Sequence, residues 1–210
     1  MIFVIKGKRG PNYASLLDSM FADRKALFVD LLGWAVSAHD GRHEMDEFDS
    51  DEAVYIIAGN QDGQHCGSLR LLPTSRPYLL QQHFASLCAD ELPSDTVTYE
   101  ITRLCLPSRL GAKRRLIVRN QLIAAMVDYA LANGIIRLVG VTEAAFRNEV
   151  LSMGWLAEPL GPICESSGRK IGAFALHIGA DTPKRLSWAD IYPVDALSTS
   201  KPNRAAGGVR

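Results

Sequence analysis

Residues Thr96–Leu106 read TVTYEITRLCL, and this stretch indicates the fold and the site together. It is rich in β-branched and aromatic residues, which favour a strand, and it is apolar enough to lie at the centre of a sheet. Two charged residues, Glu100 and Arg103, interrupt it. Burying a charge costs free energy unless the charge is paired or serves a ligand, so this strand also carries the best signal of a functional site.

The spacing of Glu100 and Arg103 sets a geometric requirement. Side chains three residues apart point to opposite faces of a regular strand, so a shared cleft requires a bulge or a splayed edge, which we predict here. A glutamate in such a cleft can take a proton from an amine, and a guanidinium can hold a carboxylate through two parallel hydrogen bonds. The alternative is an internal salt-bridge network.

The segments on either side of this strand alternate between helical and strand periods. The turn at Asp62-Gly63 lies between two apolar runs and indicates a hairpin. We therefore predict a mixed α/β sheet flanked by helices, in one domain over residues 1–197, with a small, polar and disordered tail over 198–210. The expected strands are 1–6, 53–59, 66–72, 96–106, 135–142 and 170–178, and the expected helices are 13–32, 79–87, 115–133 and 144–153.

The composition excludes several classes of protein. The 23 Lys and Arg residues balance the 23 Asp and Glu residues, so no overall charge attracts the chain to nucleic acid or to a membrane. The start, MIFVIKGKRG, is charged too early for a signal peptide, and no apolar run approaches the ~20 residues of a membrane span, so we expect a soluble cytoplasmic protein. The four cysteines lack metal-ligand spacing, and no HExxH, GxSxG, P-loop or GxGxxG motif is present, so no metal or cofactor is expected.

Arg24, Phe28 and Trp34 form the first group of candidate ligand contacts. Arg24 and Phe28 are four residues apart and share one helix face, and Trp34 follows Gly33, which ends the predicted helix. A cation beside two large rings suits a flat, charged ligand such as an adenine nucleoside bearing a sulfonium. The alternative is that these are ordinary surface and core positions of an amphipathic helix.

A crowded acidic segment follows, and such a run is most often a solvated loop. Two of its carboxylates, Asp46 and Asp49, can hold an ammonium group and compensate a sulfonium, as S-adenosylmethionine requires. The acidic residues are Glu44, Asp46, Glu47, Asp49, Asp51 and Glu52.

Basic residues gather where the long helix is expected to begin, and Arg70 in the GSLR run is a further candidate for the charged network. A phosphate at the helix start can meet both basic side chains and free backbone N–H groups, which fits a phosphopantetheine-bearing donor and also an ordinary solvated patch. Nucleic acid is weakly supported because no aromatic residues interleave the cluster. The cluster consists of Lys113, Arg114, Arg115 and Arg119.

Taken together, these residues resemble the set that marks acyl-homoserine-lactone synthases, the LuxI-type autoinducer synthases. The stretches RKALFVDLLGW, EMDEFD, GSLRLLPT and YEITRL occur in that family's order and spacing, over roughly the first half of the chain. The second half of the chain supports the resemblance less specifically, through the long helix, the VGVT strand and a short helix ending in MGW. The matching residues are Arg24, Phe28, Trp34, Asp46, Asp49, Arg70, Phe84, Glu100 and Arg103.

The resemblance implies a fold like that of the GNAT acetyltransferases, whose splayed central strands make a V-shaped cleft for a pantetheine thioester. It also implies a reaction in two steps. The amine of S-adenosylmethionine attacks the acyl thioester, and its carboxylate then attacks the γ-carbon, which closes the lactone and expels methylthioadenosine. S-adenosylmethionine and the acyl thioester are therefore expected as substrates, without a cofactor.

The resemblance also implies roles for single residues. Glu100 would be the base for the amine, and Arg103, Asp46 and Asp49 would hold the amino-acid end of the substrate. The remaining roles are closure over the nucleoside for Arg24, Phe28 and Trp34, support of the carboxylates for Arg70, the acyl or cleft wall for Phe84, and a 3-oxo-acyl contact for Thr142.

The donor and the acceptor both leave alternatives open. Relatives that use acyl carrier protein tend to carry basic residues on the helix after the Thr142 strand, and here Arg147 alone is basic, so acyl-coenzyme A is an alternative donor. A GNAT-type N-acyltransferase acting on another amine is the alternative enzyme, although it has no use for Arg24, Trp34 and the aspartate pair. A nucleic-acid-binding module leaves Glu100 and Arg103 unexplained.

Overall fold

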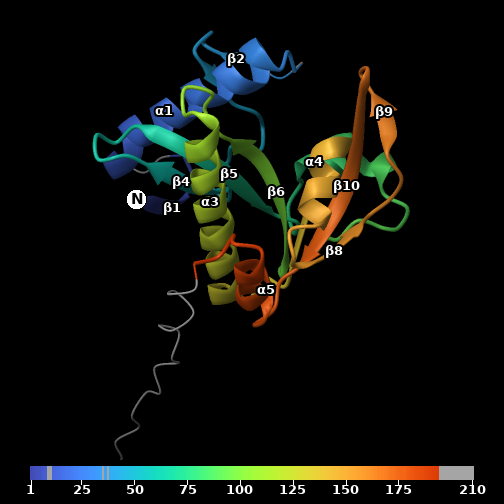
Figure 1. The fold of residues 1–210 in the computed structure, drawn as a ribbon. Coiled ribbons are helices and arrows are strands. Elements are labelled where there is room, and N and C mark those ends of the chain that lie inside the picture. Colours follow the sequence, from blue (N-terminus) through green and yellow to red (C-terminus); the bar gives the residue numbers. More distant parts are fainter. Residues whose placement is uncertain (9–10, 35, 37, 194–210) are drawn as a thin grey trace, which may run out of the picture.

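The computed structural model describes residues 1–8, 11–34, 36 and 38–193, so the predicted tail over 198–210 lies outside the described residues. One mixed sheet runs in the order β1-β4-β5-β6-β7-β10-β8, with β9 also paired to β10, and β2 and β3 form a separate ribbon (Figure 1). The strands are β1 (Ile2–Lys6), β2 (Ala38–His39), β3 (His43–Glu44), β4 (Val54–Gly59), β5 (His65–Pro73), β6 (Thr98–Cys105), β7 (Arg137–Glu143), β8 (Leu156–Pro159), β9 (Cys164–Ser166) and β10 (Arg169–His177).

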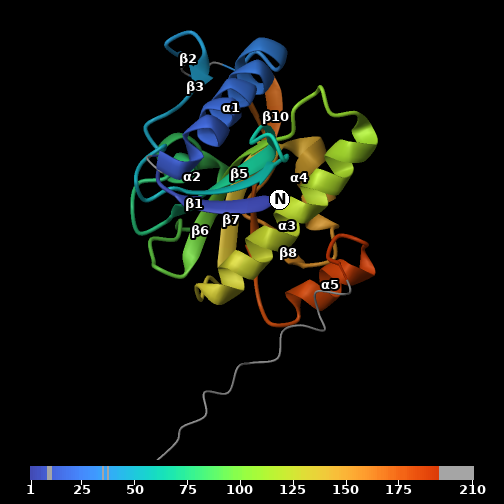
Figure 2. The same cartoon turned by 90° about the vertical axis from the view of Figure 1, so that its left-hand side faces the viewer.

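Helices cover both faces of the sheet, each over its own apolar core. Figure 2 shows α1 and α3 on opposite sides of β1 and β5; α4 and α5 share the core under α3, and α2 shares the core under α1. In the described part of the chain, no helix is both long and apolar enough to cross a membrane. The helices are α1 (Ala14–Arg24), α2 (Leu79–His83), α3 (Ala112–Ala132), α4 (Ala144–Leu151) and α5 (Thr182–Trp188), with 3-10 turns η1 (Pro11–Tyr13) and η3 (Ala85–Leu87) and a π-helix η2 (Lys25–Leu31).

Most of the predicted elements are confirmed, with two kinds of difference. The long helix begins at Ala112 rather than at 115, which places Lys113 and Arg114 inside its first turn. The strands β2, β3, β8 and β9 and the helix α5 were not predicted. These elements are short, so they span too few residues to show the hydrophobic period on which such a prediction depends.

The two central strands of the sheet separate partway along their length. β6 and β7 are parallel and pair only from Thr98 with Arg137 to Glu100 with Val139. Beyond Glu100 each strand continues without the other, β6 to Cys105 and β7 into pairing with β10. Figure 1 shows the β4–β6 part and the β10 part of the sheet leaning apart, as the predicted GNAT-like fold requires.

The irregularity predicted in β6 is confirmed at Arg103. Ser68 of β5 pairs with Cys105 and Arg70 pairs with Thr102, so β6 holds an extra residue between these pairs. Arg103 has a φ of 53°, in the left-handed region that non-glycine residues rarely adopt, and such strain clusters at functional sites. The bulge turns Arg103 to the face that carries Thr102, on the α1 side of the sheet.

Candidate active site

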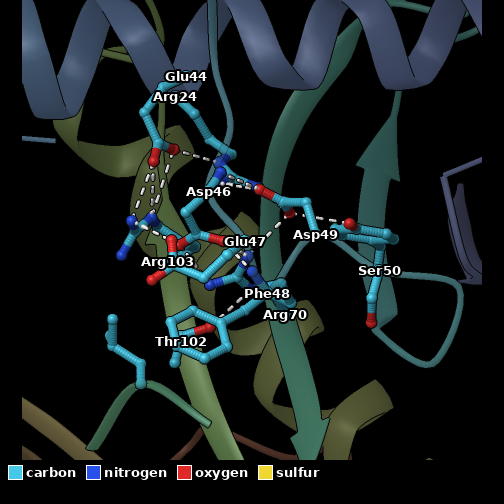
Figure 3. Close-up of polar contacts among 12 residues, drawn as sticks. Arg24, Glu44, Asp46, Glu47, Phe48, Asp49, Ser50, Arg70, Thr102 and Arg103 are labelled. Atoms are coloured by element: carbon cyan, nitrogen blue, oxygen red, sulfur yellow. Dashed lines mark hydrogen bonds and ion pairs between the residues drawn. The ribbon is translucent and has the colours of Figure 1, made fainter. Parts of the chain in front are cut away.

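A buried cluster of three carboxylates and three guanidiniums lies on the α1 side of the sheet, beside the β6 bulge (Figure 3). The carboxylates come from β3 and the loop that follows it, and the guanidiniums come from α1, β5 and β6. Because each group is paired, the burial cost of its charge is offset inside the cluster. The members are Glu44, Asp46, Asp49, Arg24, Arg70 and Arg103.

Arg24 is buried in the cluster, with only 1% of its side chain exposed. Its Nε donates to Glu44 at 2.6 Å, and its two terminal nitrogens donate to the two oxygens of Asp49 at 2.9 and 3.0 Å. Burial alone lowers the pKa of Arg24, but the charges of Asp49 and Glu44 outweigh this effect and raise it. Arg24 therefore holds carboxylates in place, and its predicted contact with a nucleoside stays a prediction.

Asp49 connects α1 with the sheet. Besides the Arg24 pair, it accepts a hydrogen bond from the hydroxyl of Tyr55 at 2.8 Å and lies 2.8 Å from the Nη1 of Arg70. Burial raises the pKa of Asp49, but Arg24 and Arg70 lower it more strongly, to well below its usual range. Asp49 is therefore held in its ionised form by the two guanidiniums.

Arg70 and Arg103 hold Asp46 between them. Arg70 donates to the two oxygens of Asp46 at 2.5 and 2.9 Å, and Arg103 donates to Asp46 at 2.8 Å. Arg103 also donates to Glu44 at 2.9 Å, and Glu44 in turn binds Arg24, so one carboxylate bridges two guanidiniums. The cluster is a closed network rather than three separate pairs.

Glu44 is the site residue that the sequence analysis does not single out. It belongs to an acidic run expected to be solvated, yet its side chain is fully buried. The available signal is the apolar content of that run: Phe48 is buried and Met45 packs against the core. A solvated loop has no need for such residues, so the EMDEFD stretch indicates a segment packed on the sheet.

Glu100 lies where the pairing of β6 and β7 ends, and it is fully buried. Its two carboxylate oxygens accept hydrogen bonds from the backbone N–H groups of Leu79 and Leu80 at the start of α2, both at 2.8 Å. Burial raises the pKa of Glu100 to about 7, although these N–H groups and the charges of Arg70 and Arg103 act in the opposite direction. A carboxyl with such a pKa can exchange a proton near neutral pH.

Phe28 and Trp34 form a stacked pair, with ring centroids 4.8 Å apart and planes inclined by 20°. The backbone N–H of Trp34 donates to the carbonyl oxygen of Phe28 at 2.8 Å, so the segment folds back as predicted. The cation over the Phe28 ring is Arg103, at 5.6 Å, whereas Arg24 lies over Phe21. The change from α-helix to π-helix after Arg24 alters the helical phase on which the four-residue spacing argument relied.

Phe84 and Thr142 lie on different parts of the fold. Phe84 ends α2 and is half-buried against the core under α1. Thr142 is on β7, opposite Gly172 of β10, beyond the point where β6 leaves β7. Their predicted contacts with the acyl chain stay predictions.

The predicted donor contacts on α3 divide between two sides of the helix. Lys113 and Arg114 line a surface cavity of about 480 Å³ beside Met1. Arg119 instead pairs with Glu149 of α4, and Arg115, one turn earlier, shares its face. The structure therefore brings only two of the four cations to the α4 side of the helix.

Arg147, the basic residue of α4, is buried. Its Nη1 donates to the carbonyl oxygens of Gly161 at 2.9 Å and Ala173 at 3.4 Å, and its guanidinium lies against Gly172. The exposed side chains of α4 include Asn148 and Glu149. This helix thus lacks a basic surface for an acidic carrier protein.

Comparison with known proteins identifies relatives of the chain. The model of the autoinducer synthase family matches residues 11–186. An acyl-homoserine-lactone synthase from Ralstonia nicotianae is 36% identical over 183 residues, which covers 83% of this chain and 89% of the relative. The crystal structure of TofI in a ternary complex with an inhibitor and MTA is 32% identical, with a TM-score of 0.74 over 89% of this chain and 96% of TofI.

A further similarity concerns the fold alone. A putative N-acetyltransferase from Lactobacillus plantarum is 18% identical, with a TM-score of 0.56 over 85% of this chain and 99% of that protein. The fold is thus the GNAT-like one, with the splayed strands described above. The family model spans most of the described residues, and the chain belongs to the autoinducer synthase family.

Proposed function

We propose that this protein synthesises an acyl-homoserine lactone from S-adenosylmethionine and an acyl thioester and releases methylthioadenosine. The observation that carries the proposal is the buried carboxyl of Glu100, with a pKa of about 7, on the strand that also presents Arg103 and leaves β7 at this point. The names of the relatives support it. The reaction takes place in the cytoplasm and needs no cofactor, nucleic acid or membrane.

In the first step the amine nitrogen of S-adenosylmethionine attacks the thioester carbonyl carbon. A C–N bond forms and the C–S bond of the thioester breaks, so the donor leaves as a thiolate. The ammonium first gives one proton to Glu100, directly or through water, and the second proton, which the nitrogen loses as the amide forms, goes to the leaving thiolate. Two lone-pair positions on the Glu100 carboxylate remain after the bonds from Leu79 and Leu80, which is enough for this transfer.

The charges of the site match this substrate. In the cluster three guanidiniums balance three carboxylates. Glu100 adds a carboxylate for which the described residues offer no ion pair. S-adenosylmethionine carries a sulfonium, an ammonium and a carboxylate, and so one net positive charge. An ionised Glu100 is the group that removes a proton from the ammonium.

In the second step the substrate carboxylate attacks the γ-carbon. A C–O bond forms while the C–S bond to the sulfonium breaks, and sulfur leaves with the electron pair as the neutral thioether of methylthioadenosine. Arg103 holds the substrate carboxylate, and Asp46 and Asp49 hold the other charges of the amino-acid end. Phe28 and Trp34 hold the nucleoside and its sulfonium. The bulge places Arg103 between the charged cluster and the Phe28 ring, so it lies beside the proposed positions of the substrate carboxylate and of the nucleoside.

The acyl donor enters where β6 and β7 separate. α3 begins at Ala112 without a side-chain cap, so its first N–H groups are available to a phosphate of the phosphopantetheine arm. Arg115 and Arg119 lie on the side of α3 that faces α4 and are the better placed of the basic residues. The absence of a basic surface on α4 favours acyl-coenzyme A over acyl carrier protein as the donor.

A mass-spectrometric assay of the purified protein tests the proposal. The protein is incubated with S-adenosylmethionine and a panel of acyl-coenzyme A and acyl carrier protein thioesters, while methylthioadenosine and acyl-homoserine lactone are followed together. Both products from one donor establish the reaction and the carrier. If no donor yields either product, the synthase proposal is wrong, and acylation of other amines is tested next.

A further inference from the structure

A second polar network lies next to the cluster and has no part in the reaction described above. Asp23 is the residue before Arg24 in α1, and its carboxylate accepts hydrogen bonds from two side chains. The Nδ1 of His65 lies 2.6 Å from Asp23, and Arg109 binds both oxygens of Asp23, with its Nη2 at 2.8 Å. Arg109 also donates to the backbone carbonyl of His65 at 2.5 Å.

The three residues come from three separate parts of the fold. Asp23 is in the last turn of α1, and His65 begins β5. Arg109 lies in the connection 106–111, which joins the separated half of β6 to the start of α3. The network therefore ties the helix that carries Arg24 to the connection that leads into α3, where the donor is proposed to bind.

The chemistry of this network indicates positioning rather than reaction. Asp23, His65 and Ser68 are arranged as a carboxylate, an imidazole and a hydroxyl, because the Nε2 of His65 lies 2.9 Å from the Ser68 hydroxyl. However, His65 and Ser68 are buried and bonded to each other, and the reaction described above uses neither of them. Burial lowers the pKa of His65, despite the opposite effect of Asp23, so the ring is neutral and donates its Nδ1 proton to Asp23.

We propose that Asp23 and Arg109 are a positioning pair that holds the connection between β6 and α3 against α1. The pair thereby fixes the start of α3, where the donor is proposed to bind, relative to the cluster that binds the amino-acid substrate. This inference rests on the proposed function. Arg109 is the exposed member of the pair, with 48% of its side chain accessible, and Asp23 is largely covered, so the contact is anchored from the α1 side.

Steady-state kinetics of Arg109→Ala and Asp23→Asn test the proposal. Freeing the connection disturbs the approach of the donor, whereas the contacts of Arg24 with Glu44 and Asp49 remain. We expect the KM for the acyl donor to rise about tenfold in each variant, while kcat and the KM for S-adenosylmethionine change less than about twofold. The matched control is Arg185→Ala, which removes a surface Arg–Asp pair on α5 (Nε to Asp181 at 2.6 Å) and should change neither KM.

Two further variants separate positioning from a general structural effect. In the double variant Asp23→Asn/Arg109→Ala, the donor KM should rise by much less than the product of the two single effects, because both changes break the shared Asp23–Arg109 contact. Arg109→Lys keeps the charge and should restore part of the donor KM. If both KM values rise equally, or if only the melting temperature falls, the positioning proposal is wrong. If the unmodified protein forms no lactone with any donor, the proposed function fails instead.

Discussion

The guanidinium carbon of Arg103 lies 5.6 Å from the centre of the Phe28 ring, which in turn stacks on Trp34. Arg103 also binds Glu44 and Asp46, so one side chain joins the charged cluster to the aromatic pair. The two ends of a single S-adenosylmethionine molecule would therefore meet adjacent protein groups. This contact depends on the bulge in β6, because a regular strand would direct Arg103 to the opposite face.

Replacing the proposed base should reduce turnover more than binding. We expect Glu100→Gln to lower kcat by on the order of 10²- to 10⁴-fold, the usual contribution of general base catalysis. S-adenosylmethionine binding, measured by isothermal titration calorimetry, should change little. The control is Glu91→Gln, an exposed position that should leave turnover unchanged. Undiminished turnover in Glu100→Gln would remove Glu100 from the mechanism.

The pH dependence of the reaction should reflect the ionisation of Glu100. Glu100 must be ionised to accept a proton, and burial raises its pKa to about 7, so kcat/KM should rise with pH and level off above about 7. A raised pKa also means that the ionised form is disfavoured in the folded protein. Protonated Glu100 therefore contributes to the free energy of unfolding. This contribution is complete below the unfolded pKa of about 4.3 and is lost as pH rises through about 7. A pH profile of Glu100→Gln that keeps the same acidic limb would contradict the assignment.

Substitutions in the cluster should act on substrate affinity. Arg103→Ala removes the proposed carboxylate contact, and Asp46→Asn removes a charge that holds Arg103 in place. We expect the dissociation constant of S-adenosylmethionine to rise about ten- to a hundredfold in both variants, in line with the loss of a charge-assisted hydrogen bond. Calorimetric titration measures this effect, and Arg76→Ala, at an exposed position, serves as the control. Unchanged affinity in both variants would rule out this binding mode.

Glu44 should be important for stability. Glu44→Gln removes the charge that lies between Arg24 and Arg103 and leaves two buried guanidiniums undercompensated. Breaking a buried ion pair from one side typically costs about 3–5 kcal/mol, and we expect a loss of that order in the free energy of unfolding measured with urea. Glu47→Gln, in the same segment but exposed, is the matched control and should have little effect. Equal stability of the two variants would contradict the view of Glu44 as a bridge.

Local features of this fold could be predicted from the sequence alone. The strand over 96–106, the hairpin and the long helix follow from hydrophobic periods and turn residues that act within a few positions of each other. The bulge was also predictable, because Glu100 and Arg103 cannot serve one cleft from a regular strand. The family resemblance, carried by motifs in the first half of the chain, agrees with the comparisons.

Which charges are buried, and with which partners, follows from the way distant segments pack in the folded chain. Glu44 and Arg147 are polar residues that the sequence does not distinguish from exposed ones, yet both are inside the fold. Arg103 rather than Arg24 reaches the aromatic pair, and the basic residues of α3 divide between two faces. The physical reason is that desolvation and ion pairing depend on segments brought together from distant parts of the chain, whereas sequence patterns report only local period and composition.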